Sequence, residues 1–346
     1  MRCVPWRLPK IADNGDNDDN GDNDDNDDAN LRAAHDALSR TKRQIGDFKR
    51  ANGVAAWSAA VARTDVRLAN GARRRPASRA YHKLIELAET CALPAPRSSL
   101  HLCEAPGGFV QATLEQFPAL MRADAHSLRA EGAPRFATAV LNEPRVRRVG
   151  LAGDGDIGRE AVRRALCAAA GPAGADLITA DGAVDCDHCP EDTEVKNLPL
   201  LRAQVQAALA AQASGGTFVV KVFAVARPET MAVIAHLCRR FERVYLAKPT
   251  TSRGVNDERY VVCTGFAGAY GVRPTEGEEG EEGEEGEESQ HGGEKIHTRG
   301  WLGEVCEASS TFAHAQRMCI EHILRDTSND RKRVRDARAP RPREGR

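Results

Sequence analysis

The stretch Leu100-His-Leu-Cys-Glu-Ala-Pro-Gly-Gly-Phe109 decides the fold of this chain. An apolar run that ends in two adjacent glycines and leads directly into helix-forming residues predicts a strand, a tight turn and a helix. Ligands bind at the carboxyl ends of strands in open α/β sheets, and glycine lets the backbone approach a ligand closely. The glycine spacing is not that of a dinucleotide fingerprint, and no Gly-Lys-Ser/Thr follows to make a phosphate loop.

Short β-branched runs alternate with helical stretches on both sides of this turn. Strands are expected at residues 99–103, 147–151, 176–180, 217–223, 244–247 and 259–264, with a further candidate at 122–128. Helices are expected at residues 31–62 (one or two helices), 78–91, 110–117, 159–170, 197–213 and 228–241. Strands alternating with helices of this length predict an α/β fold with a doubly wound, mainly parallel sheet and helices on both faces.

Composition divides the chain into six segments. Residues 1–30 have no apolar periodicity and are expected to be a disordered acidic Asp/Asn/Gly tail, without the glutamate and the flanking helices of a calcium loop. The others are an N-terminal helical segment with a basic loop (31–75), the α/β domain (76–268), an acidic Glu/Gly linker (269–294), a short helical element (295–330) and a basic tail (331–346).

The net charge of −1 conceals a basic chain. Residues 13–28 hold nine aspartates and residues 276–288 hold nine glutamates; without these 18 residues, 49 basic and 32 acidic residues leave a net charge of +17. A surplus of this size is typical of proteins that bind polyanions. An arginine-rich compositional bias is the weaker explanation, so a nucleic-acid partner is favoured.

The sequence also limits the location of the protein. No apolar run approaches the roughly 20 residues of a membrane span, and residues 1–10 lack the apolar core of a signal peptide. Ten cysteines with one close pair in 346 residues indicate reduced intracellular thiols. The basic tail 331–346 is compatible with nuclear import, but the sequence does not choose between nucleus and cytoplasm.

Three further motifs carry chemistry-bearing side chains. The apolar strand 176–180 ends in Asp181 and Gly182, and Lys221 lies inside the apolar run Gly215–Phe223. A lysine in an apolar strand is costly unless it is paired, although a strand-end lysine can also reach solvent. Glu258 precedes the last strand and follows a loop, residues 248–257, whose polar side chains suit phosphate and sugar contacts.

These motifs together resemble the FtsJ-like ribose 2′-O-methyltransferases, and most closely the cap-specific mRNA members. The resemblance rests on Ser78–Lys83, Glu104–Phe109, Thr179–Gly182, Gly216–Lys221 and Ser252–Cys263, and its closer part on Cys103–Phe109, Gly153–Ile157 and Phe241–Arg253. It covers residues 76–268 and implies a Rossmann-like, S-adenosylmethionine-dependent methyltransferase domain. The expected partner is RNA, in particular the capped 5′ end of mRNA, and no membrane association is expected.

The resemblance also implies a set of site residues. A catalytic Lys-Asp-Lys-Glu tetrad falls on Lys83, Asp181, Lys221 and Glu258. The S-adenosylmethionine site falls on Cys103, Glu104, Ala105, Pro106, Gly107, Gly108, Phe109, Asp156, Ile157 and Asp181. RNA contacts are expected at Ser78, Arg79, Ser252 and Arg253, and no metal is expected. The acidic residue that the family carries after its second strand has no counterpart here.

Ribose methylation requires a base that removes the hydroxyl proton. A free lysine, with a pKa of about 10.4, is protonated at neutral pH, so burial and a neighbouring cation such as Lys83 are expected to lower the pKa of Lys221. Lys221 is therefore predicted to be the general base, Lys83 and Glu258 its orienting and tuning partners, and Asp181 an orienting group close to the methyl donor.

Other interpretations remain open at this stage. The chain is alternatively a 2′-O-methyltransferase of ribosomal or transfer RNA, or an inactive RNA-binding subunit that keeps the fold. Cys186-x-x-Cys189 is half of a zinc site, but no second pair has matching spacing. The sequence identifies neither cap-binding residues nor protein partners.

Overall fold

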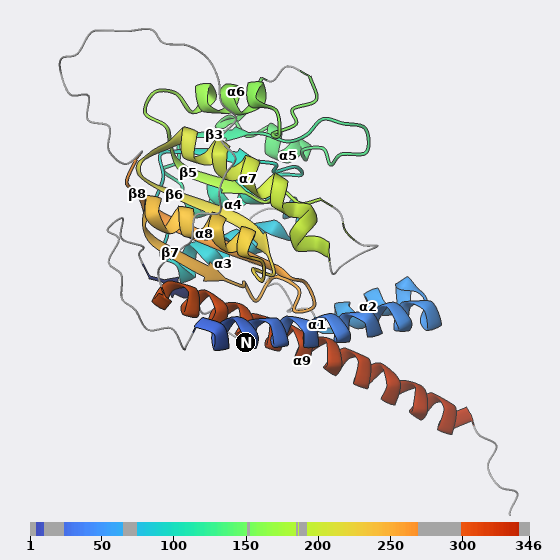
Figure 1. The fold of residues 1–346 in the computed structure, drawn as a ribbon. Coiled ribbons are helices and arrows are strands. Elements are labelled where there is room, and N and C mark those ends of the chain that lie inside the picture. Colours follow the sequence, from blue (N-terminus) through green and yellow to red (C-terminus); the bar gives the residue numbers. More distant parts are fainter. Residues whose placement is uncertain are drawn as a thin grey trace, which may run out of the picture.

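The computed structural model describes residues 5–9, 24–64, 75–150, 153–184, 186, 192–268 and 299–338. One eight-stranded sheet forms its centre (Figure 1). The strands are β1 (Trp6–Leu8), β2 (Ser98–Leu102), β3 (Arg122–Ala125), β4 (Val146–Arg148), β5 (Ala175–Ala180), β6 (Gln212–Phe223), β7 (Phe241–Ala247) and β8 (Glu258–Phe266). The helices are α1 (Asp24–Asn52), α2 (Val54–Thr64), α3 (Ala80–Thr90), α4 (Gly108–Gln116), α5 (Thr138–Leu141), α6 (Glu160–Ala170), α7 (Thr193–Ala211), α8 (Pro228–Arg240) and α9 (Arg299–Arg338).

The strand order is β1-β7-β8-β6-β5-β2-β3-β4. The five adjacent strands from β4 to β6 are parallel to one another. Strand β8 lies between β6 and β7 and is antiparallel to both. The predicted α/β fold with a mainly parallel sheet is confirmed. The order reverses direction at β2 and β5, which is where an open α/β sheet binds its ligands.

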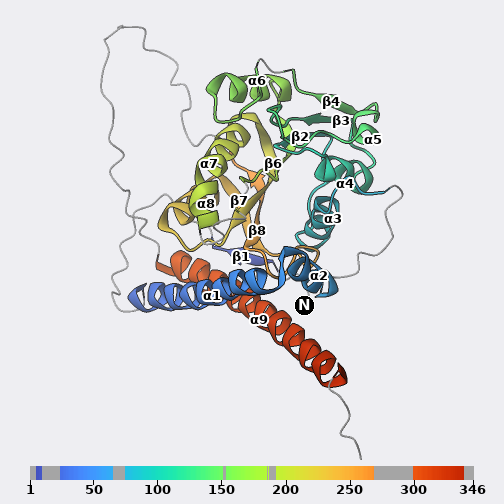
Figure 2. The same cartoon turned by 90° about the vertical axis from the view of Figure 1, so that its right-hand side faces the viewer.

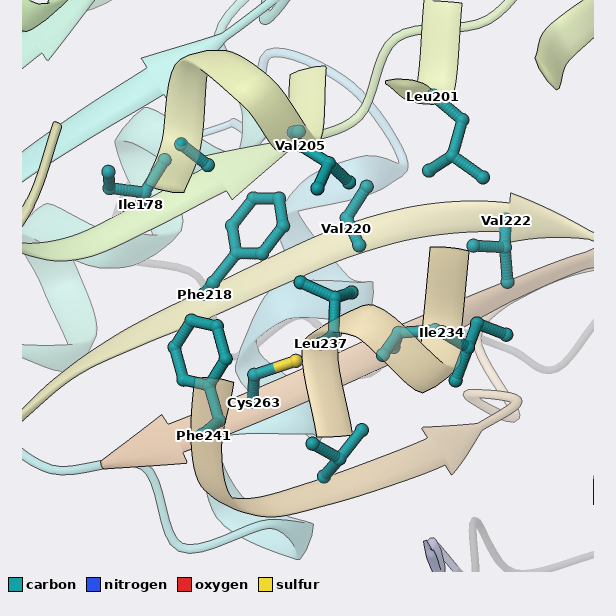
Figure 3. Packing of buried hydrophobic residues seen from close by; sticks show 14 of the residues in the cluster. Ile178, Leu201, Val205, Phe218, Val220, Val222, Ile234, Leu237, Phe241 and Cys263 are labelled. Atoms are coloured by element: carbon teal, nitrogen blue, oxygen red, sulfur yellow. The ribbon is translucent and has the colours of Figure 1, made fainter. Parts of the chain in front are cut away.

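Alternate residues of the central strands enter two hydrophobic cores, as the two-residue period of a strand requires. Phe218 and Val220 of β6 pack with α7 and α8 on one face (Figure 3). Val219 between them packs with α3 and α4 on the other face. Figure 2 shows the two helical layers on opposite sides of the sheet. Helices on both faces explain why these strands are apolar at nearly every position.

Local chemistry sets the ends of several elements close to their expected positions. Pro228 begins α8, where its missing N–H costs nothing. Gly171 ends α6 with a φ of 81°, a conformation that favours glycine. Strand β6 is longer than predicted, because Gln212 of this strand already pairs with Ala175 of β5. The short helix α5 lies in a stretch whose pattern predicted no element.

A third helical layer lies outside the α/β domain. Helix α9 runs alongside α1 and beyond the body of the protein (Figures 1 and 2). Leu38 of α1, Trp57 of α2 and Ile320 of α9 share a separate hydrophobic cluster. The first half of α9 also reaches the main core through Trp301 and Val305. The two ends of the chain therefore form one structural unit with the sheet.

This layer corrects two expected boundaries. Residues 1–30 are not wholly a disordered tail, because Trp6–Leu8 pairs antiparallel with β7 and α1 begins at Asp24. Residues 295–330 do not form a short element, because α9 has 40 residues. Strand β1 is stabilised by pairing with the edge strand β7, and α9 by packing against α1. A local sequence pattern does not reveal such distant partners. Among the described residues no helix is long and apolar enough to cross a membrane.

Truncating the centre of the main core tests this packing. Phe218 is fully buried between α7 and α8. We expect Phe218→Ala to lower the free energy of unfolding by about 3–5 kcal/mol, because it removes apolar contacts and leaves a cavity. Urea denaturation measures this change. Val54→Ala is the control, because Val54 is 64% exposed and its truncation should cost less than about 0.5 kcal/mol.

Candidate active site

The four predicted tetrad residues come together at one edge of the sheet. Strands β6 and β8 are antiparallel, so the carboxyl end of β6 meets the amino end of β8, with Lys221 opposite Tyr260 and Phe223 opposite Glu258. The two-residue period places Lys221, Glu258 and Tyr260 on the face that α3 covers. Lys83 reaches them from α3, and Asp181 follows the end of β5.

Lys83 and Glu258 form one buried ion pair of the site. The Lys83 Nζ lies 2.6 Å from Glu258 Oε1, and both side chains are about nine-tenths buried. The Ser252 hydroxyl donates a second hydrogen bond to the same oxygen, at 2.8 Å. Burial raises the pKa of Glu258, but Lys83, Lys221 and these hydrogen bonds lower it more, to about 2. Glu258 is therefore a fixed anion at neutral pH.

Lys221 and Asp181 form the second pair. The Lys221 Nζ lies 3.2 Å from Asp181 Oδ1 and donates to the Asp181 backbone carbonyl at 2.6 Å. The Tyr260 hydroxyl donates to Asp181 Oδ1 at 2.8 Å. The Asp181 carboxylate thus has two fixed partners, and the ammonium of Lys221 is held between β5 and β6. Lys221 does not extend to solvent, because its side chain is 8% exposed.

The electrostatic balance at Lys221 differs from the expectation. Burial lowers its pKa, as predicted, but Asp181, Glu258 and Glu104 together raise it more, so the net pKa lies above its ordinary value. The prediction that burial and Lys83 leave Lys221 with a lowered pKa is therefore wrong. Counting the charges along the sequence did not reveal that three carboxylates surround this amine.

The turn after β2 contains a second buried carboxyl group. Glu104 Oε1 accepts a hydrogen bond from the Phe109 backbone N–H at 2.6 Å. Its Oε2 atom is buried and has no hydrogen-bond partner among the described residues. Burial and the nearby Asp181 raise the pKa of Glu104 well above its ordinary value. Pro106 follows a cis peptide bond, and the Ala137 backbone N–H donates to its carbonyl at 3.0 Å.

Both glycines of the turn have packing reasons to be glycine. Gly107 has a φ of 108°, and a Cβ there would lie 3.0 Å from Val140. A Cβ on Gly108 would lie 2.2 Å from the Ser78 hydroxyl oxygen. Helix α4 therefore begins in direct contact with the residues that precede α3. The Phe109 side chain is fully buried and packs near Tyr260, so it supports the turn from behind.

The loop before α6 supplies Asp156 and Ile157. The Asp156 carboxylate is exposed and accepts from the Gly158 N–H at 2.9 Å. Ile157 is 3% exposed and belongs to the main core, so burial there accounts for its apolar side chain. His126 follows β3, and its ring contacts the Cys103 N–H and the Gly155 carbonyl. It thereby joins the β2 turn to this loop.

Three carboxyl groups, those of Glu104, Asp156 and Asp181, lie around the β2 turn. The Cys103 thiol interacts electrostatically with Glu104, Asp156, Asp181 and Lys221; burial and the three carboxylates raise its pKa to about 12. S-adenosylmethionine carries a sulfonium and an ammonium group, and the carboxyl groups around this turn, including the Glu104 Oε2 atom, which accepts no hydrogen bond from a described residue, fit such a cation. Of the predicted cofactor residues, Glu104, Asp156 and Asp181 are those whose charge would hold it, and the role of the others, Ile157 included, stays a prediction.

The loop between β7 and β8 is anchored on α3. The Glu86 carboxylate accepts from the backbone N–H and the hydroxyl of both Thr250 and Thr251, at 2.7–3.0 Å. Arg79 donates to the Thr251 carbonyl at 3.0 Å. Lys248, at the end of β7, donates to the carbonyls of Asn256 and Glu258 at 2.6 and 2.9 Å. This loop therefore has a defined position relative to the tetrad.

Of the four residues predicted to contact RNA, one is exposed and the other three support neighbouring parts of the fold. Arg253 is exposed on this loop. Ser252 is buried and its hydroxyl binds Glu258, so it supports the tetrad. Ser78 accepts from the Ala80 N–H at the start of α3, and Arg79 links that helix to the loop. Ser78 and Ser252 thus have structural partners that the motifs alone did not predict.

Sequence reasoning missed several residues that shape the site. Tyr260 stands two residues after Glu258, so strand periodicity would have placed both on one face. Glu86 gave no such signal, because its partners Thr250 and Thr251 lie 164 and 165 residues away in the sequence. Lys248 and His126 gave none either, because they bind backbone carbonyls and a backbone N–H, which have no side-chain pattern. Most of the half zinc motif, including Cys189, lies outside the described residues. The described residues contain no group of three or more side chains suited to hold a metal ion.

Comparisons with known proteins identify relatives of this chain. A cap-specific mRNA (nucleoside-2′-O-)-methyltransferase 1 from Bos taurus is 34% identical over 175 residues, which are 47% of this chain and 21% of that protein. The corresponding human protein is 33% identical over the same shares. A cap-specific mRNA (nucleoside-2′-O-)-methyltransferase 2 from Drosophila melanogaster is 28% identical over 262 residues, 68% of this chain and 37% of that protein. The chain thus spans well under two thirds of these relatives.

The family assignment rests on the α/β domain. Residues 76–266, more than half of the chain, match the FtsJ-like methyltransferase family. This range contains the β2 turn, both buried ion pairs and the anchored loop. The chain therefore belongs to the FtsJ-like methyltransferase family.

Proposed function

We propose that this protein is an S-adenosylmethionine-dependent mRNA cap methyltransferase that transfers a methyl group to the ribose 2′-hydroxyl of a cap-proximal nucleotide. The observation that carries the proposal is the pair of buried contacts Lys83–Glu258 and Lys221–Asp181 beside the acidic β2 turn. Burying four charged side chains is costly, and such clusters are typical of sites that shift proton affinities for catalysis.

The chain's residues divide the work between proton removal and alignment. Bound S-adenosylmethionine supplies a methyl group that its positive sulfur has already activated. Lys221, after losing its own proton to solvent, accepts the proton of the 2′-hydroxyl at Nζ, while Asp181 and its backbone carbonyl fix the direction of that amine. Lys83 and Glu258 hold each other in place beside it. Alignment of this kind contributes several kcal/mol to catalysis.

RNA is the substrate class that the charge of the chain supports. The net charge of +17 outside the two acidic tracts favours a polyanion, and phosphate contacts set its register. Arg253 is exposed on the loop beside Glu258, where an incoming strand would pass. The names of the relatives favour the capped end of mRNA over other RNA.

The substrate is tested with labelled S-adenosylmethionine and matched transcripts. We expect label in capped transcripts and little in the same transcripts without a cap. Nuclease digestion and mass spectrometry then map the modified nucleotide. Equal labelling of both transcripts would instead support a methyltransferase of ribosomal or transfer RNA. No labelling of any RNA would contradict the proposed activity.

Removing the proposed base should abolish the reaction. We expect Lys221→Ala to reduce methyl transfer by at least about 10³-fold, because no other amine stands in its place. The affinity for S-adenosylmethionine, measured by calorimetry, should change little. Lys49→Ala removes the same charge from the last turn of α1 and serves as the control. A Lys221→Ala protein with normal turnover would refute the assignment of the base.

The raised pKa of Lys221 predicts a pH dependence. Since the pKa lies above its ordinary value, the neutral amine is a small fraction at neutral pH and grows with pH. The single-turnover rate should therefore rise about tenfold per pH unit between pH 7 and 9. A rate that is already constant from pH 7 upwards would show that the base is not a lysine with a raised pKa.

A further inference from the structure

Helices α1 and α9 lie outside the residues that match the family, yet both contact the segment around Glu258. We propose that the two helices form a clamp, made by Lys42, Ser309 and Gln316, that positions Glu258 for methyl transfer. The inference rests on the proposed function. It makes Lys42, Ser309 and Gln316 positioning residues, because they act on the reacting groups through the backbone of residues 255–259.

The first contact of the clamp comes from α1. Lys42 forms an ion pair with Asp257, the residue before Glu258, and the two side chains are 12% and 8% exposed. Burial raises the pKa of Asp257, but Lys42 and other partners lower it more, so the carboxylate stays ionised. Breaking a buried ion pair would leave an unpaired charge in the interior, which is strongly destabilising. This link therefore fixes Asp257 on α1.

The second contact comes from α9 on the same short segment. The Gln316 side-chain amide donates to the Val255 carbonyl at 2.7 Å. Gln316 is 2% exposed, so water does not compete for this hydrogen bond. A Cβ on the neighbouring Gly254 would lie 2.8 Å from the Cys319 sulfur of α9. Helix α9 is therefore in direct contact with the loop that leads to Glu258.

The third contact lies on the other side of Glu258. Arg259 is 1% exposed and donates to the Ala224 carbonyl and, at 2.8 Å, to the Ser309 hydroxyl of α9. Its guanidinium also lies 5.1 Å from the ring centroid of Phe312. Ser309 in turn donates to the same Ala224 carbonyl, at 2.8 Å. Without α9 this buried cation would lose the Ser309 hydroxyl and the Phe312 ring as partners.

The periodicity of the strand explains why these contacts act on Glu258. Asp257 and Arg259 point to one side of the chain and Glu258 to the other, toward Lys83. The clamp thus holds the residues on both sides of Glu258 from behind, while Lys83 and Ser252 bind its carboxylate from the front. A displacement of about 1 Å in a reacting group lowers a rate by about 10²-fold, so such support matters for turnover.

The test compares two substitutions of neighbouring residues in the full-length protein. Lys42→Met breaks the buried pair, whereas Arg43→Met removes the same charge from an exposed position on α1. For Lys42→Met we expect kcat to fall at least about 10-fold, with the KM for RNA and the Kd for S-adenosylmethionine within about twofold. Arg43→Met should keep the kcat of the unchanged protein, and Lys42→Arg should restore most of it.

A double variant separates positioning from stability. Lys42→Met with Asp257→Asn removes both charges of the ion pair, so its thermal midpoint should lie above that of Lys42→Met alone while kcat stays low. Recovery of kcat together with stability would overturn the clamp, as would a folded Lys42→Met protein with normal kcat. If Lys42→Met does not fold, Gln316→Leu tests the same segment from α9, with an expected fall in kcat of about 3- to 10-fold and normal kcat as the refuting result.

The outcome for the unchanged protein separates the two proposals. If it methylates no RNA, the proposed function fails before any variant is made. If it is active and the clamp variants match it in kcat, the proposed function stands and the inference about α1 and α9 fails.

Discussion

The burial of two lysines against two carboxylates at the end of β5, β6 and β8 is the constraint on which this structure depends. An unpaired charge at any of these positions would be far more costly than the pair. The sheet therefore has to bring Asp181, Lys221 and Glu258 into register, and α3 has to place Lys83 over them. Insertion of β8 antiparallel beside β6 satisfies both requirements, because it turns Glu258 toward α3.

The same arrangement sets the charge state of the site. Lys221 lies beside Asp181, Glu258 and Glu104, and these carboxyl groups raise its pKa above its ordinary value despite burial. The pKa of Glu104, in the β2 turn, is also raised, but by burial and by the nearby Asp181 carboxylate, because both disfavour its charged form.

The helices at the two ends of the chain support this site from outside the family domain. They share a small hydrophobic cluster of their own, join the main core through Trp301 and Val305, and make polar contacts around residues 255–259. Buried polar contacts are directional, whereas apolar contacts are not, so they are suited to fix a position. Glu86 provides the corresponding support on the opposite side of the loop.

The sequence alone determined the α/β class, most strands and helices, and the β2 turn, because two-residue and helical periodicities and glycine pairs are local signals. The family resemblance pointed to Lys83, Asp181, Lys221 and Glu258, which the structure brings together in two ion pairs, while their catalytic role stays a prediction. Only the tertiary structure decided what surrounds them: the raised pKa of Lys221, the use of Ser252 on Glu258, and the contacts of Glu86, Lys248 and Lys42. These depend on residues up to 215 positions apart, as for Lys42 and Asp257, and no local pattern encodes which distant charge becomes a neighbour after folding.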